Sequence, residues 1–214
     1  MLPSGRWICT ITASAGAEGS KGEHVAALWS DDAGRSWSAP VPVEPEPLRL
    51  PNAYSMTLVA PALGARGRVY TIYNMNTQNI THDGPGGPLL ARTDMMGGYF
   101  LRYSDDEGAS WSRRRYPVPF RLTSIDTQNE WHGATTIGWS VDQPKVRDGA
   151  AYFAFTKIGK YLLGPPESLW VLKSPNLLSV RDAADVTWQL LPDGDDGIRP
   201  MRGQAQTHLE EAHV

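Results

Sequence analysis

The stretch Ser30-Asp31-Asp32-Ala33-Gly34-Arg35-Ser36-Trp37-Ser38 decides the fold, because it returns almost unchanged as Ser104-Asp105-Asp106-Glu107-Gly108-Ala109-Ser110-Trp111-Ser112. Both stretches follow the pattern S-x-D-x-G-x-S-W. A repeat in which serines, aspartate, glycine and tryptophan keep their register indicates an architecture built from copies of one unit. We call the two stretches the first and second Trp turns.

The chemistry of each Trp turn is that of a β-hairpin. The aspartate can accept hydrogen bonds from backbone N–H groups, and the glycine can adopt a positive φ. The tryptophan starts the next strand, where we expect its ring to be buried between strands or layers. We favour this structural interpretation over a pair of catalytic carboxylates. The structural residues are Ser30, Asp32, Gly34, Ser36 and Trp37 in the first turn, and Ser104, Asp106, Gly108, Ser110 and Trp111 in the second.

Short strands are predicted for most of the chain, because 21 glycines and 17 prolines separate segments rich in Val, Ile, Thr, Tyr and Trp. The segments 5–12, 67–74 and 149–156 resemble one another, each being a turn glycine followed by a strand. The segments 57–62 and 143–146 precede the second and third of these and read as their hairpin partners. The best helix candidate, Arg181 to Asp185, is short.

A third, degenerate copy of the turn begins at Ser174-Pro175-Asn176 and ends at Thr187-Trp188, with an insertion between. We call it the third Trp turn. The three tryptophans are 74 and 77 positions apart, so about three units fit the chain. A four-stranded unit of this kind is what radial β-propellers repeat.

The pattern of the Trp turns resembles the Asp box, or BNR repeat, of the sialidase-like β-propellers. In that family the box closes the hairpin between the outer strands of a blade, away from the active site. The resemblance implies an all-β fold, a six-bladed propeller of which residues 1–214 form about three blades of a single partial domain. The remaining blades are expected to be encoded outside the chain, because it opens within a hairpin and closes with what reads as the first residues of another inner strand. The isolated chain should then be marginally stable.

The resemblance also implies an exo-acting glycoside hydrolase that cleaves terminal sugars from glycans. Enzymes of this family use an arginine triad, a tyrosine nucleophile paired with a glutamate, and an aspartate acid/base. Most of this set is expected outside the chain, which alone should be inactive. Glu210 or Glu211 stands where the family has the supporting glutamate, and the acid/base region contains Glu18 and Glu23 but no aspartate. Each of these glutamates also reads as an ordinary solvated side chain.

Positions that end equivalent strands should gather around one axis, where pockets form. In this sequence they are Asn74, Asn76 and Lys157, with Asp142 at the matching start of a strand. We expect Asp142 and Lys157 to face each other as pocket residues, or as a plain salt bridge. Trp131 and His132, with Trp139, could form a platform on which a sugar stacks, although core packing explains tryptophans equally well.

Charge and composition narrow the choice of partners. Charged residues make up 20% of the chain and the net charge is −3, so nothing indicates a nucleic acid partner. Cys9 reads as a packing residue. No segment has the length of a membrane span or the form of a secretory signal, so the chain as written would be expected to stay in the cytosol, whereas a longer protein could be secreted or periplasmic; the sequence leaves the localisation unknown. Asp193 to Gly197 reads as an ordinary acidic turn rather than a calcium site, and no metal or cofactor is expected.

Two other functions remain open. One is a non-catalytic Asp-box propeller that binds carbohydrate or protein, which the missing aspartate favours. The other is a different glycan-active enzyme, a hydrolase or lyase, on the same scaffold.

Overall fold

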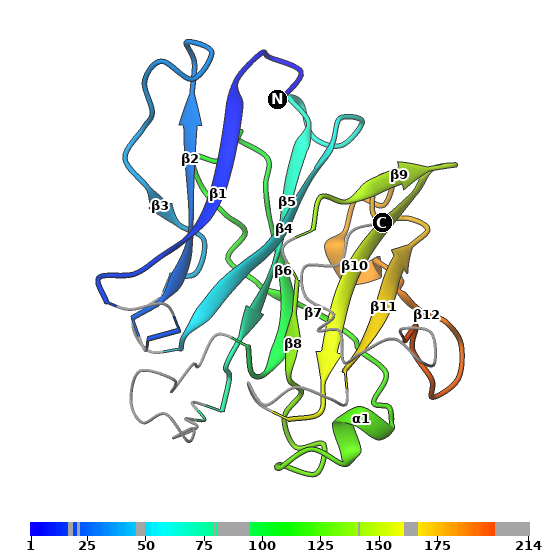
Figure 1. Ribbon diagram of the computed structural model, residues 1–214. Coiled ribbons are helices and arrows are strands. Elements are labelled where there is room, and N and C mark those ends of the chain that lie inside the picture. Colours follow the sequence, from blue (N-terminus) through cyan, green and yellow to red (C-terminus); the bar gives the residue numbers. More distant parts are fainter. Residues whose placement is uncertain are drawn as a thin grey trace.

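The computed structural model describes residues 1–16, 19–20, 22–45, 50–78, 80, 95–140, 142–160 and 167–199. It is an all-β structure of three antiparallel sheets that lie side by side (Figure 1). Helical structure in the described residues is limited to α1 (Ser124–Thr127) and a 3₁₀ helix, η2 (Ala183–Asp185). The expected all-β class is confirmed.

Sheet 1 contains β1 (Trp7–Ala13), β2 (His24–Ser30) and β3 (Val41–Pro42), paired in that order. Sheet 2 contains β4 (Asn52–Ala60), β5 (Arg68–Met75), β6 (Gly98–Ser104) and β7 (Tyr116–Val118), again in chain order. The strands predicted from the repeated glycine-led segments and from the segment 57–62 are therefore present.

Sheet 3 contains two short strands, β8 (Gly138–Trp139) and β9 (Lys145–Arg147), which both pair with β10 (Ala150–Ile158). It continues with β11 (Glu167–Ser174) and β12 (Gln189–Leu191). Together β8 and β9 take the place that β4 has in sheet 2. A strand was predicted at 143–146, and the structure begins it at Lys145.

The cores lie between the sheets. On sheet 2, Tyr73 and Met75 pack against Val25 and Ala27 of sheet 1. The opposite face of sheet 2, including Tyr70, Ile72 and Leu101, packs against Phe153 and Phe155 of sheet 3. Side chains alternate between the faces of a strand, so each sheet has two faces. In sheet 2 we call the face toward sheet 1 the front and the face toward sheet 3 the back. The front of sheet 1 is accordingly the face opposite to the one that contacts sheet 2, and the back of sheet 3 is likewise the face opposite to the one that contacts sheet 2.

All three Trp turns lie at the same end of the sheets. The register pairs Trp7 with Ser30, Val69 with Ser104 and Ala151 with Ser174, so β2, β6 and β11 each end at a turn where β1, β5 and β10 begin. We call this the turn end. The strands β1, β5 and β10 finish at the opposite, loop end, where α1 also lies (Figure 1).

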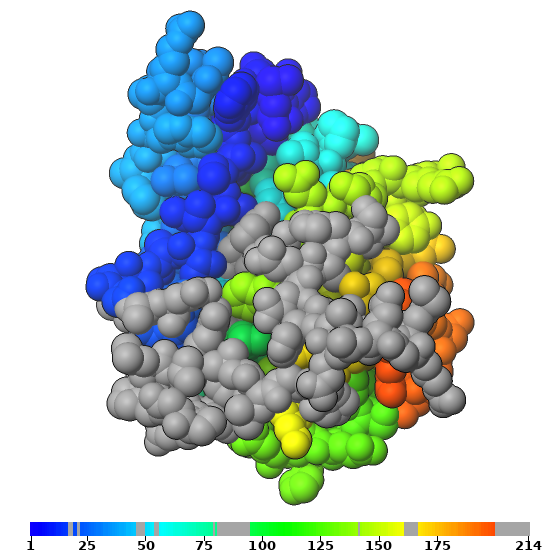
Figure 2. Space-filling model, viewed as in Figure 1, coloured from blue at the N-terminus to red at the C-terminus, as the bar shows by residue number. Residues whose placement is uncertain are grey.

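The space-filling view shows the three sheets in their chain order (Figure 2). Sheet 1, in blue, forms one flank and the yellow and orange residues of sheet 3 form the other. Within the described residues, no helix has both the length and the apolar character that crossing a membrane requires.

Candidate functional site

The first Trp turn is closed by its own side chains. Ser30 Oγ donates to Asp32 Oδ1 over 2.8 Å and accepts from the Gly34 backbone N–H over 2.8 Å. Asp32 accepts from the Ser36 backbone N–H at 2.8 Å and from the Ser36 hydroxyl at 2.6 Å. The Ser36 hydroxyl and N–H, followed by the Ser30 hydroxyl, hold the pKa of Asp32 at about 2, because each stabilises the ionised form.

The second Trp turn repeats these bonds. Ser104 Oγ donates to Asp106 Oδ1 at 2.7 Å and accepts from the Gly108 N–H at 2.8 Å. Asp106 accepts from the Ser110 N–H at 2.8 Å and from its hydroxyl at 2.5 Å. Burial raises the pKa of Asp106, but the hydrogen bonds from Ser110 and Ser104 outweigh burial and lower it. In both turns, therefore, both carboxylate oxygens of the aspartate accept hydrogen bonds within the turn.

The third Trp turn keeps the arrangement with an amide in place of the carboxylate. The Leu177 N–H donates to Ser174 Oγ at 3.1 Å, as the glycine N–H does in the other turns. Asn176 Oδ1 accepts from the Thr187 N–H at 2.9 Å and from the Thr187 hydroxyl at 3.2 Å. The insertion separates the paired residues by 11 positions instead of 4 but leaves the bonding scheme in place.

The tryptophans of the turns differ in burial. Trp111 is half-buried and packs against the core between sheets 1 and 2, and Trp188 packs against Phe153 with ring centroids 5.8 Å apart. Trp37 is 44% exposed, so the expectation that its ring is buried between layers is wrong. The rings of Trp111 and Trp188 have a neighbouring sheet to pack on, whereas Trp37 lies on the front of sheet 1, the first sheet of the chain.

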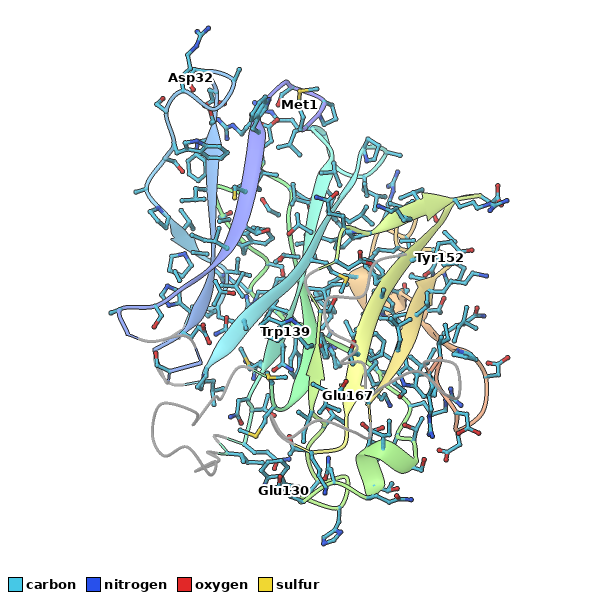
Figure 3. The ribbon with its side chains drawn as sticks, viewed as in Figure 1. Met1, Asp32, Glu130, Trp139, Tyr152 and Glu167 are labelled. Atoms are coloured by element: carbon cyan, nitrogen blue, oxygen red, sulfur yellow. The ribbon has the colours of Figure 1, made fainter. Side chains whose placement is uncertain are left out.

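The loop end lies opposite these turns. In Figure 3, Asp32 is at one extreme of the molecule and Glu130 at the other, with Trp139 and Glu167 in the half nearer Glu130. The strands β1, β5 and β10 finish at the loop end, at Ala13, Met75 and Ile158, so the ends of equivalent strands from three sheets lie at this end of the molecule. This is the candidate site.

Lys157 is held at the loop end by a complete set of partners. Its Nζ donates to Asp126 Oδ2 at 2.5 Å, to the Arg121 carbonyl at 2.7 Å and to Thr123 Oγ1 at 3.3 Å. The side chains of Lys157 and Asp126 are 3% and 0% exposed. Burial lowers the pKa of Lys157, and the hydrogen bond and charge of Asp126 oppose that change. The ion pair fixes α1 against β10.

Asp142 and Lys157 do not face each other. Asp142 is buried and its Oδ2 accepts from the Ala154 N–H at 2.7 Å, whereas Lys157 lies opposite Gly138 in the strand register. The expectation was wrong because two short strands, β8 and β9, pair with the same edge of β10 and are separated by an unpaired segment. Asp142 lies in that segment and is opposite Ala154 instead of Lys157.

The two predicted asparagines behave differently. Asn76 is fully buried and closes a turn, since its Nδ2 donates to the Ile80 carbonyl at 2.6 Å and its Oδ1 accepts from the Ile80 N–H at 2.9 Å. Asn74 is 3% exposed, and within the part of the chain that the structure describes neither atom of its amide has a hydrogen-bond partner. A buried amide without partners is costly to the fold, so Asn74 is one of the buried side chains at this end with unused hydrogen-bonding capacity, together with Asp126, Thr135 and Thr156.

The aromatic residues of the loop end form part of a small core. Trp131 and Trp139 are half-buried and pack against the cluster of Met95, Met96, Ile137 and Ile158. His132 is exposed, with φ of 51°. The predicted platform residues therefore comprise two tryptophans that pack in an apolar cluster and an exposed histidine.

Of the predicted catalytic residues, only Glu23 lies within the described part of the chain. Its side chain is 3% exposed, and Oε2 accepts from the Gly19 N–H at 3.0 Å. Glu18, Glu210 and Glu211 lie outside the described residues.

Sequence analysis missed a buried cluster between sheets 1 and 2. Glu44 accepts from the Tyr73 hydroxyl and from Arg102, with Nε to Oε1 at 2.8 Å and Nη2 to Oε2 at 3.2 Å. Burial, and then the charge of Glu44, raise the pKa of Tyr73. All three residues are at most 4% exposed, so we interpret the cluster as a buried polar contact that holds the two sheets together. Partners 29 and 58 positions apart gave no local signal in the sequence.

Among the described residues, no group of three or more His, Cys, Asp or Glu side chains lies close enough together to hold a metal ion. In the acidic turn, Asp195 Oδ1 accepts from the Ser124 N–H at 2.7 Å, which ties the loop after β12 to α1.

Comparison with known proteins rests on structure, since no family model and no curated protein matches the chain. Hadza microbial sialidase Hz136 superposes with a TM-score of 0.54 at 17% identity, over 88% of this chain and 35% of that one. The fold of this chain is therefore similar to that of part of this sialidase. A protein of unknown function from Dyadobacter fermentans also gives 0.54, at 12% identity over 88% and 51% of the two chains. An ulvan lyase, a polysaccharide lyase, gives 0.44 at 10% identity over 89% and 42%.

The chain spans about a third of the length of the Hadza sialidase and about half of that of the Dyadobacter protein. At these identities the likeness concerns the fold alone.

Proposed function

We propose that this sialidase-like chain forms about three blades of a six-bladed β-propeller, and that the whole protein is an exo-acting glycoside hydrolase that removes terminal sugars from glycans. The observation that carries the proposal is the pair of Trp turns. They share one set of hydrogen bonds and lie at the same end of neighbouring sheets, in a fold similar to that of a sialidase.

The substrate would bind at the loop end. At the turn end, the aspartate and serine side chains of the two complete turns already form hydrogen bonds with each other. The loop end offers the unpartnered amide of Asn74, which can donate to one sugar hydroxyl and accept from another. It also offers Trp131, whose apolar surroundings suit stacking on a sugar ring.

In this proposal Lys157 is a positioning residue and does not contact the substrate. Its three N–H donors are already taken, so its role is to hold α1 and the loop that carries Trp131 in place. Glu210 or Glu211 would support a tyrosine nucleophile, and Glu18 or Glu23 would supply the acid/base.

A non-catalytic propeller that binds carbohydrate is the second candidate. It is favoured by the partners of Asp142 and Glu23, because both carboxylates are buried and accept backbone N–H groups within the fold, from Ala154 and Gly19.

The test uses the protein that contains this chain with 4-methylumbelliferyl glycosides of sialic acid and of neutral sugars. We expect release of the fluorophore from at least one glycoside. Trp131→Ala should raise KM more than it lowers kcat, and Val146→Ala, at an exposed residue of β9 outside the apolar cluster, is the matched control. Binding of released glycans without hydrolysis would select the second candidate, and absence of both would reject the two together.

A further inference from the structure

A groove lies between β7 and β12, the edge strands of sheets 2 and 3. One wall consists of β7 and its flanking residues, and the other consists of the third Trp turn and β12. The groove has two hollows of about 570 and 150 Å³, both lined by Trp188. The larger is within the range of small-molecule sites, about 300–1,000 Å³. Both walls belong to the described chain, so the groove is separate from the front of sheet 1 and the back of sheet 3.

Aromatic rings in the groove are held in place by the core behind them. Trp188 packs against Phe153 with ring centroids 5.8 Å apart. Phe120 packs against Phe155 at 4.5 Å and against Tyr99 at 4.7 Å. Trp188 and Phe120 are nevertheless only half-buried, so part of each side chain is accessible from the groove. Rings fixed in this way can stack on a ligand with little further loss of side-chain freedom.

Polar side chains along the groove offer both donors and acceptors. Arg114, Gln189 and Asp193 line it and are exposed. Arginine only donates, an ionised aspartate only accepts, and glutamine does both. Arg121 is already engaged, because it donates to the Pro192 carbonyl at 2.9 Å and so joins the two walls. The remaining guanidinium and carboxylate balance in charge, which favours an uncharged ligand.

The edge strands are poorly suited to an extended peptide. A peptide would bind by adding a strand to β7 or β12, but Pro117 lies within β7, Pro119 follows it, and Pro192 follows β12. Prolines lack the N–H that a further strand requires, and they protect edge strands from such pairing. A sugar chain needs no backbone ladder, because its rings present C–H faces for stacking and its hydroxyls both donate and accept.

We propose that this groove binds a segment of an uncharged polysaccharide. Trp188 and Phe120 stack on sugar rings, and Arg114, Gln189 and Asp193 form hydrogen bonds with the hydroxyls. The ligand is a chain rather than a single sugar, because two hollows adjoin at one tryptophan. No residue proposed to contact the substrate at the loop end lines the groove, so the inference does not depend on the proposed activity.

The test is affinity electrophoresis of the protein that contains this chain, in native gels with β-glucan, xylan or galactomannan. We expect at least one of these neutral polymers to slow its migration. Gln189→Ala and Asp193→Ala should each raise the Kd about 10-fold through lost hydrogen bonds. Arg114→Ala should act likewise, and Arg147→Ala, at an exposed arginine of β9 outside the groove, is its matched control. Far-UV circular dichroism verifies that each variant is folded.

Trp131→Ala separates the groove from the loop end, since it should leave the retardation unchanged. Retardation that Trp131→Ala abolishes and the groove variants keep would overturn the proposal. Migration unaffected by all three polymers, or slowed only by the anionic polymer alginate, would also overturn it. Retardation by casein that the groove variants weaken would identify a peptide groove instead. Retardation by a neutral polymer without hydrolysis of any glycoside would support this proposal while rejecting the proposed activity.

Discussion

The first two Trp turns and the third are closed by equivalent hydrogen bonds but use different acceptor groups and different spacings. In the complete turns a carboxylate accepts from a residue 4 positions on, and in the third an amide accepts from a residue 11 positions on. The serine before it bonds a backbone N–H in all three. The comparison teaches that the turn requires one oxygen acceptor two residues after the serine, and tolerates variation in the loop between.

The complete turns also share an ion pair that the third unit lacks. Arg68 binds Asp105 through two hydrogen bonds of 2.7 and 2.8 Å, and Arg6 binds Asp31 through two of 2.7 and 2.9 Å. At the equivalent positions of the third unit stand Ala150 and Pro175. Both partners are missing together there, so no unpaired charge is left behind.

Breaking the second turn should have the largest effect. Asp106→Ala removes the acceptor of three hydrogen bonds, from Ser104 and from the N–H and hydroxyl of Ser110. We expect the free energy of unfolding to fall by about 2 kcal/mol, as for loss of a capping side chain. Urea denaturation measures it. Asp193→Ala, in an exposed turn, is the control, and an equal loss in both variants would contradict the account.

The ion pairs should differ in strength because their burial differs. Side chains of Arg68 and Asp105 are 9% and 43% exposed, whereas those of Arg6 and Asp31 are 20% and 63% exposed. A double-mutant cycle to alanine should give a coupling of about 1 kcal/mol for the first pair and about 0.5 kcal/mol or less for the second. Arg68 also donates to the Arg181 carbonyl at 2.6 Å. Equal couplings would show that burial does not distinguish the pairs.

Acid should weaken the complete turns and spare the third. The pKa of Asp32 is about 2, and that of Asp106 is also lowered. Stability from a lowered carboxyl pKa is present above the ordinary value near 3.8 and is lost as pH falls from there through the folded pKa. Carboxyl ¹³C shifts of the two aspartates should therefore titrate below 3.8, and the Thr187 amide should not follow them, since Asn176 does not ionise. Titration of both aspartates at 3.8 would refute the assignment.

Converting the third turn toward the first two should have the smallest effect. Asn176→Asp supplies a charged acceptor to Thr187, which we expect to add about 0.5 kcal/mol at neutral pH. The gain should disappear at about pH 2, where the carboxylate is protonated. Asn129→Asp, at an asparagine outside the turns that also accepts backbone N–H groups, should lack this gain. A destabilised Asn176→Asp variant would mean that the turn needs the amide's own donor, which reaches the Asp185 carbonyl at 3.0 Å.

Much of the fold was predictable because its signals are local. The positive φ of Gly34 and Gly108 and the strand alternation follow from residues adjacent in sequence. The helix α1 escaped prediction, since it has 4 residues and begins at a capping box in which the Thr123 N–H and hydroxyl donate to Asp126. That carboxylate is also the partner of Lys157, 31 positions away.

The candidate site was predictable only in part. The repeats placed Asn74 and Lys157 near the ends of equivalent strands, and β5 and β10 do end beside them, at Met75 and Ile158. They failed for Asp142, since no sequence pattern revealed that the inner strand of sheet 3 is divided into β8 and β9. The Glu44 cluster depends on packing between sheets, which local patterns do not encode.

Hydrogen exchange at three amides tests the central claim, that all three Trp turns share one hydrogen-bond frame. The N–H groups of Ser36, Ser110 and Thr187 donate to Asp32, Asp106 and Asn176. We predict slowed exchange at all three, measured by NMR at neutral pH, with protection at Ser110 lost in Asp106→Ala and kept at Thr187. Exchange of the Thr187 amide at the rate of an unstructured peptide would contradict the claim, because the third turn would then not be a copy of the first two.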